Sequence, residues 1–118
     1  MKENIVARKS YLFALEIIKL YTHISGEKKE FVLSKQLLRS GTAVGALIRE
    51  AEHAESIKDF LHKMSISLKE ANETLYWLQL LKDSSIIDIS FYNSIFPLVE
   101  ELVKLLVSIV RTTKNKVY

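Results

Sequence analysis

The chain has 118 residues, and its 17 lysines and arginines against 14 aspartates and glutamates give a formal net charge of +3. This length predicts a single domain covering residues 1–118, and the absence of cysteine excludes disulfides, thiolate metal sites and cysteine nucleophiles. The mildly basic pI, near 9.1, permits contact with nucleic acid without requiring it.

Three glycines and one proline favour long helices joined by short loops, because turns and strand corners use these residues heavily. No signal peptide is visible. The most apolar segment, residues 95–110, contains Pro97 and three charged side chains, so it is not expected to span a membrane. We therefore expect a cytoplasmic, all-α protein that forms an up-and-down antiparallel four-helix bundle and does not contact membranes.

The first helix is predicted over about residues 4–25, with Gly26 as its C-terminal stop. Alternating steps of four and three residues place one set of side chains on a single face. This set comprises Ala7, Tyr11, Ala14, Ile18 and Tyr21.

The second helix is predicted over about residues 30–53, with Ser34, Leu38, Gly41, Gly45 and Ile48 on the matching face. Each internal glycine costs about 1 kcal/mol of helix propensity relative to alanine. Because glycines four residues apart let a neighbouring helix approach closely, we interpret Gly41 and Gly45 as a packing notch. The alternative, a break at Gly41, is disfavoured because the apolar period continues through Ile48.

The third helix, over about residues 57–82, has the clearest signal. Ser56 is a good N-cap, and Asp59 three residues later can complete a capping box. An unbroken heptad-like seam follows, which is typical of helices in bundles. The seam comprises Ile57, Leu61, Met64, Leu68, Ala71, Leu75 and Leu78.

The fourth helix is predicted over about residues 90–113. Pro97 either kinks this helix or lies in the first turn of a regular part that begins near Ser94. Two adjacent apolar seams follow. The first contains Ile95, Leu98, Leu102, Leu105 and Ile109, and the second contains Phe96, Val99, Val103, Leu106 and Val110.

The two seams together make an apolar arc that is too wide for one bundle core. We therefore predict that the second seam, Phe96, Val99, Val103, Leu106 and Val110, forms an interface between copies of the chain. The alternative is a wide core face under a closely packed neighbour.

Two basic stripes are candidate nucleic-acid contacts. Lys35, Arg39 and Arg49 share a face of the second helix, where they could line a groove or the lumen of a ring and meet phosphates. The alternative is a solvated helix face that happens to be basic. Lys104, Arg111 and Lys114 form a similar stripe on the last helix, although cations near a helix C-terminus also suit its dipole.

No catalytic residue, metal site or cofactor is predicted. Glu50 with His53, and Asp59 with His62, imitate the Glu-x-x-His pairs of di-iron bundles, but Glu50 is out of phase with the apolar face. No glycine-rich phosphate loop is present. Tyr76 and Trp77 could stack on bases. An aromatic residue at this helical spacing is more typical of a core or an interface.

Within residues 33–81 the chain resembles the four-helix-bundle family of bacterial 23S ribosomal RNA intervening-sequence proteins. The motifs that carry this resemblance are Arg39-Ser40-Gly41-Thr42, Gly45-Ala46, Arg49-Glu50-Ala51, Ala54-Glu55-Ser56, Lys58-Asp59-Phe60, His62-Lys63, Lys69-Glu70-Ala71 and Glu73-Thr74-Leu75-Tyr76-Trp77-Leu78. Leu47 departs from the family, which usually has asparagine there, so a hydrogen bond or ligand contact can be missing.

A distant relative of this family is the accessory protein of diversity-generating retroelements, a pentamer that binds nucleic acid and a reverse transcriptase. The resemblance thus implies a homo-oligomer, with a pentamer as the candidate assembly, and RNA or DNA as the candidate ligand. It provides no catalytic residues. The leading hypothesis is therefore a non-enzymatic oligomeric protein that binds RNA or DNA, and the alternative is a protein–protein adaptor or scaffold with no nucleic-acid role.

Overall fold

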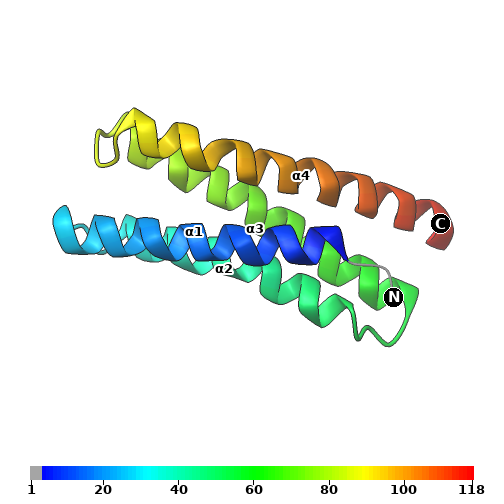
Figure 1. Ribbon diagram of the computed structural model, residues 1–118. Coiled ribbons are helices and arrows are strands. Elements are labelled where there is room, and N and C mark those ends of the chain that lie inside the picture. Colours follow the sequence, from blue (N-terminus) through cyan, green and yellow to red (C-terminus); the bar gives the residue numbers. More distant parts are fainter. Residues whose placement is uncertain (1–3) are drawn as a thin grey trace.

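The structure, a computed structural model, describes residues 4–118. Its four helices are α1 (Ile5–Glu27), α2 (Leu33–Ala51), α3 (Ile57–Asp83) and α4 (Ile89–Val117). The chain runs up and down, so the α1–α2 and α3–α4 connections lie at one end of the bundle (Figure 1). The α2–α3 connection lies at the other end, beside the start of α1 and the end of α4. This arrangement confirms the predicted all-α four-helix bundle.

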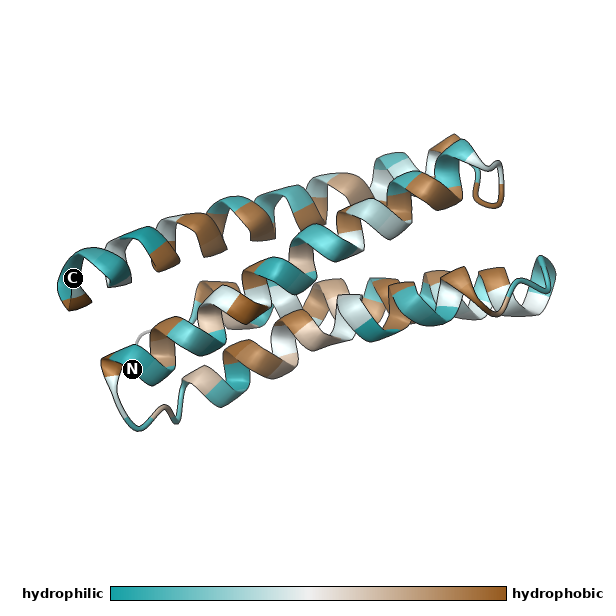
Figure 2. Cartoon of the chain, turned by 180° about the vertical axis from the view of Figure 1, so that it is seen from behind, coloured by the Kyte–Doolittle hydropathy of each residue, from teal (hydrophilic) through white to brown (hydrophobic). Residues whose placement is uncertain are grey.

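The helices occupy the four corners of the bundle. α1 packs against α2 and α4, and α3 also packs against α2 and α4, so α1 and α3 lie diagonally opposite each other. Alternating hydrophilic and hydrophobic bands along the helices show their amphipathic character (Figure 2). The apolar sides enclose one core that runs along the bundle.

The junction between α1 and α2 differs from the prediction. Gly26 lies inside the last turn of α1, and the backbone enters the left-handed region at Lys29, with φ 55°. α2 begins at Leu33 because the Glu30 side chain caps its first turn from outside the helix. The Glu30 carboxylate accepts hydrogen bonds from the backbone N–H groups of Val32 (2.9 Å), Leu33 (2.8 Å) and Ser34 (2.8 Å).

The starts of α3 and α4 both follow the prediction closely, whereas a regular α4 that begins only near Ser94 is not observed. The Ser56 hydroxyl accepts a hydrogen bond from the Asp59 N–H (3.0 Å), and the Asp59 carboxylate accepts one from the Glu55 N–H (3.1 Å). α4 begins at Ile89, so Pro97 lies well inside it rather than in its first turn. The Pro97 ring is exposed, which keeps the interruption of the backbone hydrogen bonding on the solvent side.

The core side of α1 is shifted by one residue from the predicted face. The side chains buried along α1 are those of Val6, Ser10, Phe13, Ile17, Leu20 and Ile24. Tyr11 and Ile18, which were predicted to share a face with Ala7, Ala14 and Tyr21, are exposed. The physical reason is that residues 11–18 are apolar almost all round the helix, so the spacing fits more than one face.

The predicted second seam of α4 is wrong as an interface at three of its five positions. Val99, Leu106 and Val110 are buried within the chain itself, and Phe96 and Val103 are half-buried. The buried side of α4 takes residues from both predicted seams, because the core contacts drift around the helix over its length. Its buried residues are Ile95, Val99, Leu102, Leu106, Val110 and Thr113.

Gly41 and Gly45 lie where α1 approaches α2, as the packing-notch interpretation predicts. A Cβ added at Gly41 would lie 2.9 Å from both γ-carbons of Ile17, a fully buried side chain with little freedom to move. A Cβ at Gly45 would lie 3.1 Å from the Ser10 hydroxyl. Gly26, by contrast, faces open space.

We expect Gly41→Ala to lower the free energy of unfolding by about 1 kcal/mol, because the overpacking penalty exceeds the gain in helix propensity. Gly26→Ala is the matched control and should leave that free energy unchanged or raise it by up to about 1 kcal/mol. Urea unfolding followed by circular dichroism measures both. A Gly41→Ala protein as stable as the Gly26→Ala protein would contradict the close approach.

Glu30 makes a pH-dependent contribution to stability. Burial alone would raise the pKa of Glu30, but the N–H groups of Leu33, Ser34 and Val32 outweigh it and hold that pKa below the ordinary value of 4.5. Because the charged form is favoured in the folded state, this stabilisation is fully present above pH 4.5. It is lost as the pH falls through the lowered pKa.

We therefore expect Glu30→Gln to reduce the free energy of unfolding by about 1 kcal/mol at neutral pH, since the amide retains an acceptor but loses the charge. The difference from the unmodified protein should disappear in acid, where Glu30 is itself protonated. Glu27→Gln, at an exposed carboxylate, is the control and should have little effect at either pH. A pH-independent effect of Glu30→Gln would refute the charged cap.

Candidate nucleic-acid interface

The basic stripe predicted on α2 is interrupted by an ion-pair network. Lys35, Arg39 and Arg49 are all exposed, but Arg39 binds Glu70 (3.0 Å) and Glu73 of α3. The Trp77 indole N–H donates to the same Glu73 carboxylate (2.9 Å). The charge of Arg39 is therefore used to join α2 to α3.

Two cations of the α2 stripe are left without such a partner. Lys35 and Arg49 form no ion pair within residues 4–118, but they lie 14 positions apart, so about 21 Å of helix separates them. Leu47, the departure from the family pattern, is half-buried on the same helix. The α2 stripe therefore offers two isolated charges rather than a continuous basic surface.

The stripe predicted on α4 stays largely available. Lys104 Nζ lies 4.0 Å from a carboxylate oxygen of Glu100, and its side chain is highly exposed. Arg111 and Lys114 have no carboxylate partner in the described part of the chain. They border a shallow groove between α3 and α4, of about 310 Å³, whose apolar lining includes Leu68.

The outward side of α3 is a basic surface that the sequence reasoning missed. We define the α3 outer face as the row of residues opposite the buried side of α3, all of them at least partly exposed. It contains Lys58, His62, Ser65, Lys69, Asn72, Tyr76 and Gln79. The seven-residue spacing of His62, Lys69 and Tyr76 was the sequence signal that could have revealed it.

From Lys58 to Gln79 the α3 outer face contains no carboxylate, and Asp83, which follows in the last turn of α3, forms an ion pair with Lys82 (3.5 Å). The other three acidic residues of α3 make contacts away from this row, because Asp59 caps the helix and Glu70 and Glu73 bind Arg39. Lys58 and Lys69 have no ion pair among the described residues. Both lysines therefore keep their charge available for a ligand.

The α3 outer face and the free cations of α4 border one surface. Leu68 lines the groove beside Arg111 and Lys114, and Ser65 and Asn72 of the α3 outer face lie three residues before and four residues after it, next to it on the helix. We call the set Lys58, Lys69, Arg111 and Lys114 the α3–α4 cationic surface. It gathers four unpaired positive charges from two adjacent helices.

The two adjacent aromatic residues of α3 have different surroundings. Trp77 is half-buried and packs against the core, in agreement with the prediction that it is a core or interface residue. Tyr76 is 57% exposed. The two rings meet edge to face, with their centroids 5.2 Å apart. Tyr76 is therefore a surface aromatic within the α3 outer face.

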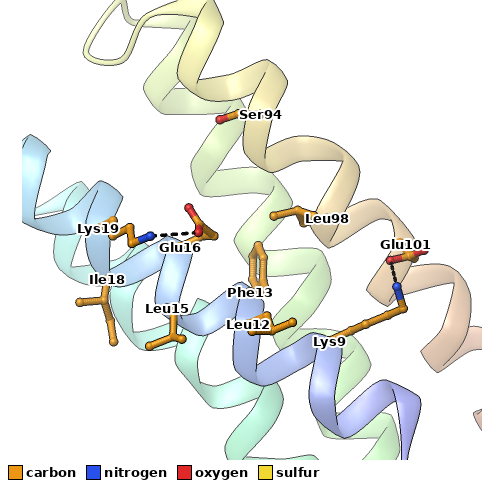
Figure 3. A pocket seen from close by; sticks show the side chains of 10 residues that line it. All are labelled: Lys9, Leu12, Phe13, Leu15, Glu16, Ile18, Lys19, Ser94, Leu98 and Glu101. Atoms are coloured by element: carbon orange, nitrogen blue, oxygen red, sulfur yellow. Dashed lines mark hydrogen bonds and ion pairs between the residues drawn. The ribbon is translucent and has the colours of Figure 1, made fainter.

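The sequence suggests that α4 has more apolar side chains than one core can bury. In the structure, a cluster of exposed apolar side chains lies instead on α1. We define the α1 outer face as Tyr11, Leu12, Leu15 and Ile18, of which Leu12, Leu15 and Ile18 are 48%, 40% and 44% exposed. Beside it, a groove of about 670 Å³ runs between α1 and α4, lined also by Phe13 and Leu98 (Figure 3).

The same groove is bordered by two ion pairs. Lys9 of α1 binds Glu101 of α4 (2.8 Å), and Lys19 binds Glu16 on α1 itself (3.3 Å). The charges of Lys9 and Lys19 are thus neutralised by their own chain. This side of the bundle is apolar with balanced charges, whereas the α3 side is cationic.

The carboxylates of the two acid–histidine pairs, Glu50 and Asp59, are engaged in other contacts. Lys63 donates to the Glu50 carboxylate (3.0 Å), and this hydrogen bond raises the pKa of Lys63. Among residues 4–118 no three histidine, aspartate or glutamate side chains come together in a way that could hold a metal ion. Over the same range no helix combines the length and apolar character that crossing a membrane requires.

Comparison with known proteins places the chain in a family. Residues 2–108 match the family described as 23S rRNA-intervening sequence protein. A crystal structure of a protein with unknown function from the S23 ribosomal protein family of Bacteroides thetaiotaomicron is 53% identical. Its TM-score is 0.87, and the match covers 89% of this chain and 97% of that one. None of the curated proteins matches the chain.

Proposed function

The chain belongs to the family of 23S rRNA-intervening sequence proteins, and we propose that it is a non-enzymatic, self-associating protein that binds RNA or DNA. The observation that carries the proposal is the α3–α4 cationic surface, where four cations have no carboxylate partner in residues 4–118. Cations of this kind displace the counterions of a phosphate backbone, and that release drives binding. Lys35, Arg49 and Lys104 are further, more isolated contact candidates.

We rank the candidate contacts by whether an ion pair within the chain already neutralises their charge. Cations held in ion pairs must break those pairs before they can bind phosphate, whereas Lys69, Arg111 and Lys114 need not. The α2 stripe is the weaker candidate, since its central residue, Arg39, is bound to two carboxylates. This ranking distinguishes a specific surface from a general attraction due to the net charge of +3.

A matched pair of triple variants tests the surface. We expect Lys69→Gln with Arg111→Gln and Lys114→Gln to weaken RNA binding at about 50 mM salt by ten-fold or more, and to flatten the salt dependence by roughly one unit of slope for each lost phosphate contact. Lys9→Gln with Lys19→Gln and Lys63→Gln removes the same charge from ion-paired sites and should change affinity little. Fluorescence anisotropy with labelled RNA and DNA measures the binding.

Two outcomes would contradict the nucleic-acid proposal. One is the absence of any binding of RNA or DNA by the unmodified protein at low salt. The other is an equal loss of affinity in the two triple variants, because binding would then follow net charge and not the α3–α4 cationic surface. Circular dichroism of each variant checks that the helices remain intact.

The proposed self-association rests on the α1 outer face. Helix segments that are apolar almost all round are normally buried all round, and the single chain covers only one side of residues 11–18 of α1. The adjoining α1–α4 groove extends the same apolar surface. A second copy of the chain would remove Leu12, Leu15 and Ile18 from water. The number of five subunits comes from the family resemblance and stays a prediction.

We expect Leu15→Glu to dissociate the assembly, because Leu15 lies at the centre of the α1 outer face and a buried carboxylate there would have no partner. Val32→Glu, at an exposed apolar residue between α1 and α2, is the control and should not change the mass. Native mass spectrometry and light scattering measure the oligomeric state. An unmodified protein that stays monomeric at high concentration would contradict self-association.

The alternative function, a protein–protein adaptor, has the same apolar surface in its favour. An adaptor would use the α1 outer face and the α1–α4 groove to hold a different polypeptide. A stoichiometric protein partner that copurifies with the chain, resists nuclease treatment and is lost in Leu15→Glu would favour this alternative. The cytoplasmic location and the absence of enzymatic activity remain predictions in either case.

A further inference from the structure

We propose that the α3 outer face recognises single-stranded nucleic acid by stacking an unpaired base on Tyr76. This inference rests on the proposed nucleic-acid binding and adds the form of nucleic acid that the surface selects. The observation behind it is an exposed aromatic side chain in a row of cations and amides that contains no carboxylate between Lys58 and Gln79.

Tyr76 is as exposed as Tyr11, but it belongs to a row of polar and charged side chains and not to the apolar α1 outer face. More than half of the side chain is exposed, and its ring contact is with Trp77, whose indole N–H is fixed by Glu73. The Trp77 ring, packed against the core, therefore supports Tyr76 from one side. A ring held in this way can stack on a base with little loss of conformational entropy.

The spacing of the row suits a single strand. His62, Lys69 and Tyr76 follow each other at intervals of seven residues, so each lies about 10 Å along α3 from the next. Lys58, near the start of the helix, extends the row to about 27 Å. The cations would bind phosphates on one side of the stacked base. A single strand lying along α3 would therefore contact the lysines, Lys58 and Lys69, and then the ring of Tyr76.

The neighbours of Tyr76 add hydrogen-bonding groups. Asn72 lies four residues before it and Gln79 three residues after it, so both amides are next to Tyr76 on the exposed side of α3. Each amide has donors and an acceptor that can bind the edge of a base. Base edges and base faces are both accessible in an unpaired strand, whereas a duplex hides the faces inside its stack.

The other role for an exposed aromatic residue, an anchor for self-association, fits Tyr76 poorly. α3 is diagonally opposite α1, so Tyr76 does not adjoin the α1 outer face. Its neighbours within the α3 outer face are polar or charged. The α3–α4 groove, which holds the nearest unpaired cations of α4, opens beside the same helix.

The test compares three labelled probes with the full-length protein. These are a single-stranded uridine dodecamer, an RNA duplex of the same length, and a dodecamer of abasic ribose phosphates that keeps the charge but lacks bases. Tyr76→Leu removes the ring and Tyr76→Phe keeps it. Because Trp77 is the single tryptophan of the chain and contacts Tyr76, its fluorescence reports directly on a base bound there.

We expect the uridine strand to bind more tightly than the abasic strand and to change the Trp77 fluorescence. Tyr76→Leu should weaken uridine binding by roughly five- to a hundred-fold, in line with the loss of one stacked base. Tyr76→Phe should bind as the unmodified protein does. Neither variant should alter binding of the abasic strand or the duplex, both of which engage the cations alone.

Equal binding of the uridine and abasic strands, with Tyr76→Leu unaffected, would overturn the stacking inference and leave the proposed nucleic-acid binding in place. Tighter binding of the duplex than of the uridine strand would overturn it too. A complete lack of binding to all three probes would instead overturn the proposed function. An altered mass of Tyr76→Leu in light scattering would count against the inference, because it would place Tyr76 in an interface between copies.

Discussion

A helix at the corner of a four-helix bundle can bury only the side that faces the core, and this constraint governs the whole molecule. α2, α3 and α4 largely satisfy it, although Leu98 of α4 is 39% exposed in the groove beside α1. α1 does not, because it buries Phe13 and Ile17 on one side and exposes Leu12, Leu15 and Ile18 on the other. The close approach of α1 to α2 at Gly41 fixes which side faces inward, since Ile17 occupies the space of a missing Cβ.

Much of the fold could be predicted from the sequence, because four helices with short connections follow from apolar spacing and from the Ser56 cap. The sides of the helices were harder to predict where apolar residues are abundant. In α1 the spacing fits two faces, and in α4 the buried row crosses between two seams, so Val99 and Leu106 belong to the core of a single chain. The Glu30 cap was missed because a carboxylate before a helix also fits a first helical turn.

The candidate site depends on contacts between helices that no local pattern contains. Arg39 has the appearance of a nucleic-acid contact on α2, but its partners Glu70 and Glu73 lie on α3, more than thirty residues away. The same pairing removes two carboxylates from the outer side of α3 and leaves Lys58 and Lys69 unpaired. The same ion pairs therefore neutralise the central charge of the predicted α2 stripe and leave the lysines of α3 without carboxylate partners. Arg111 and Lys114, by contrast, were correctly placed on the surface by their spacing alone.

The diagonal placement of α1 and α3 has a geometric consequence for any assembly built on the α1 outer face. Copies that meet through α1 turn their α3 helices away from the shared centre. The cations and Tyr76 would then lie on the outside of the assembly. A bound strand would follow this outer surface and would not pass through the middle of the assembly. The length of strand protected from nuclease would grow with the perimeter, and hence with the number of subunits.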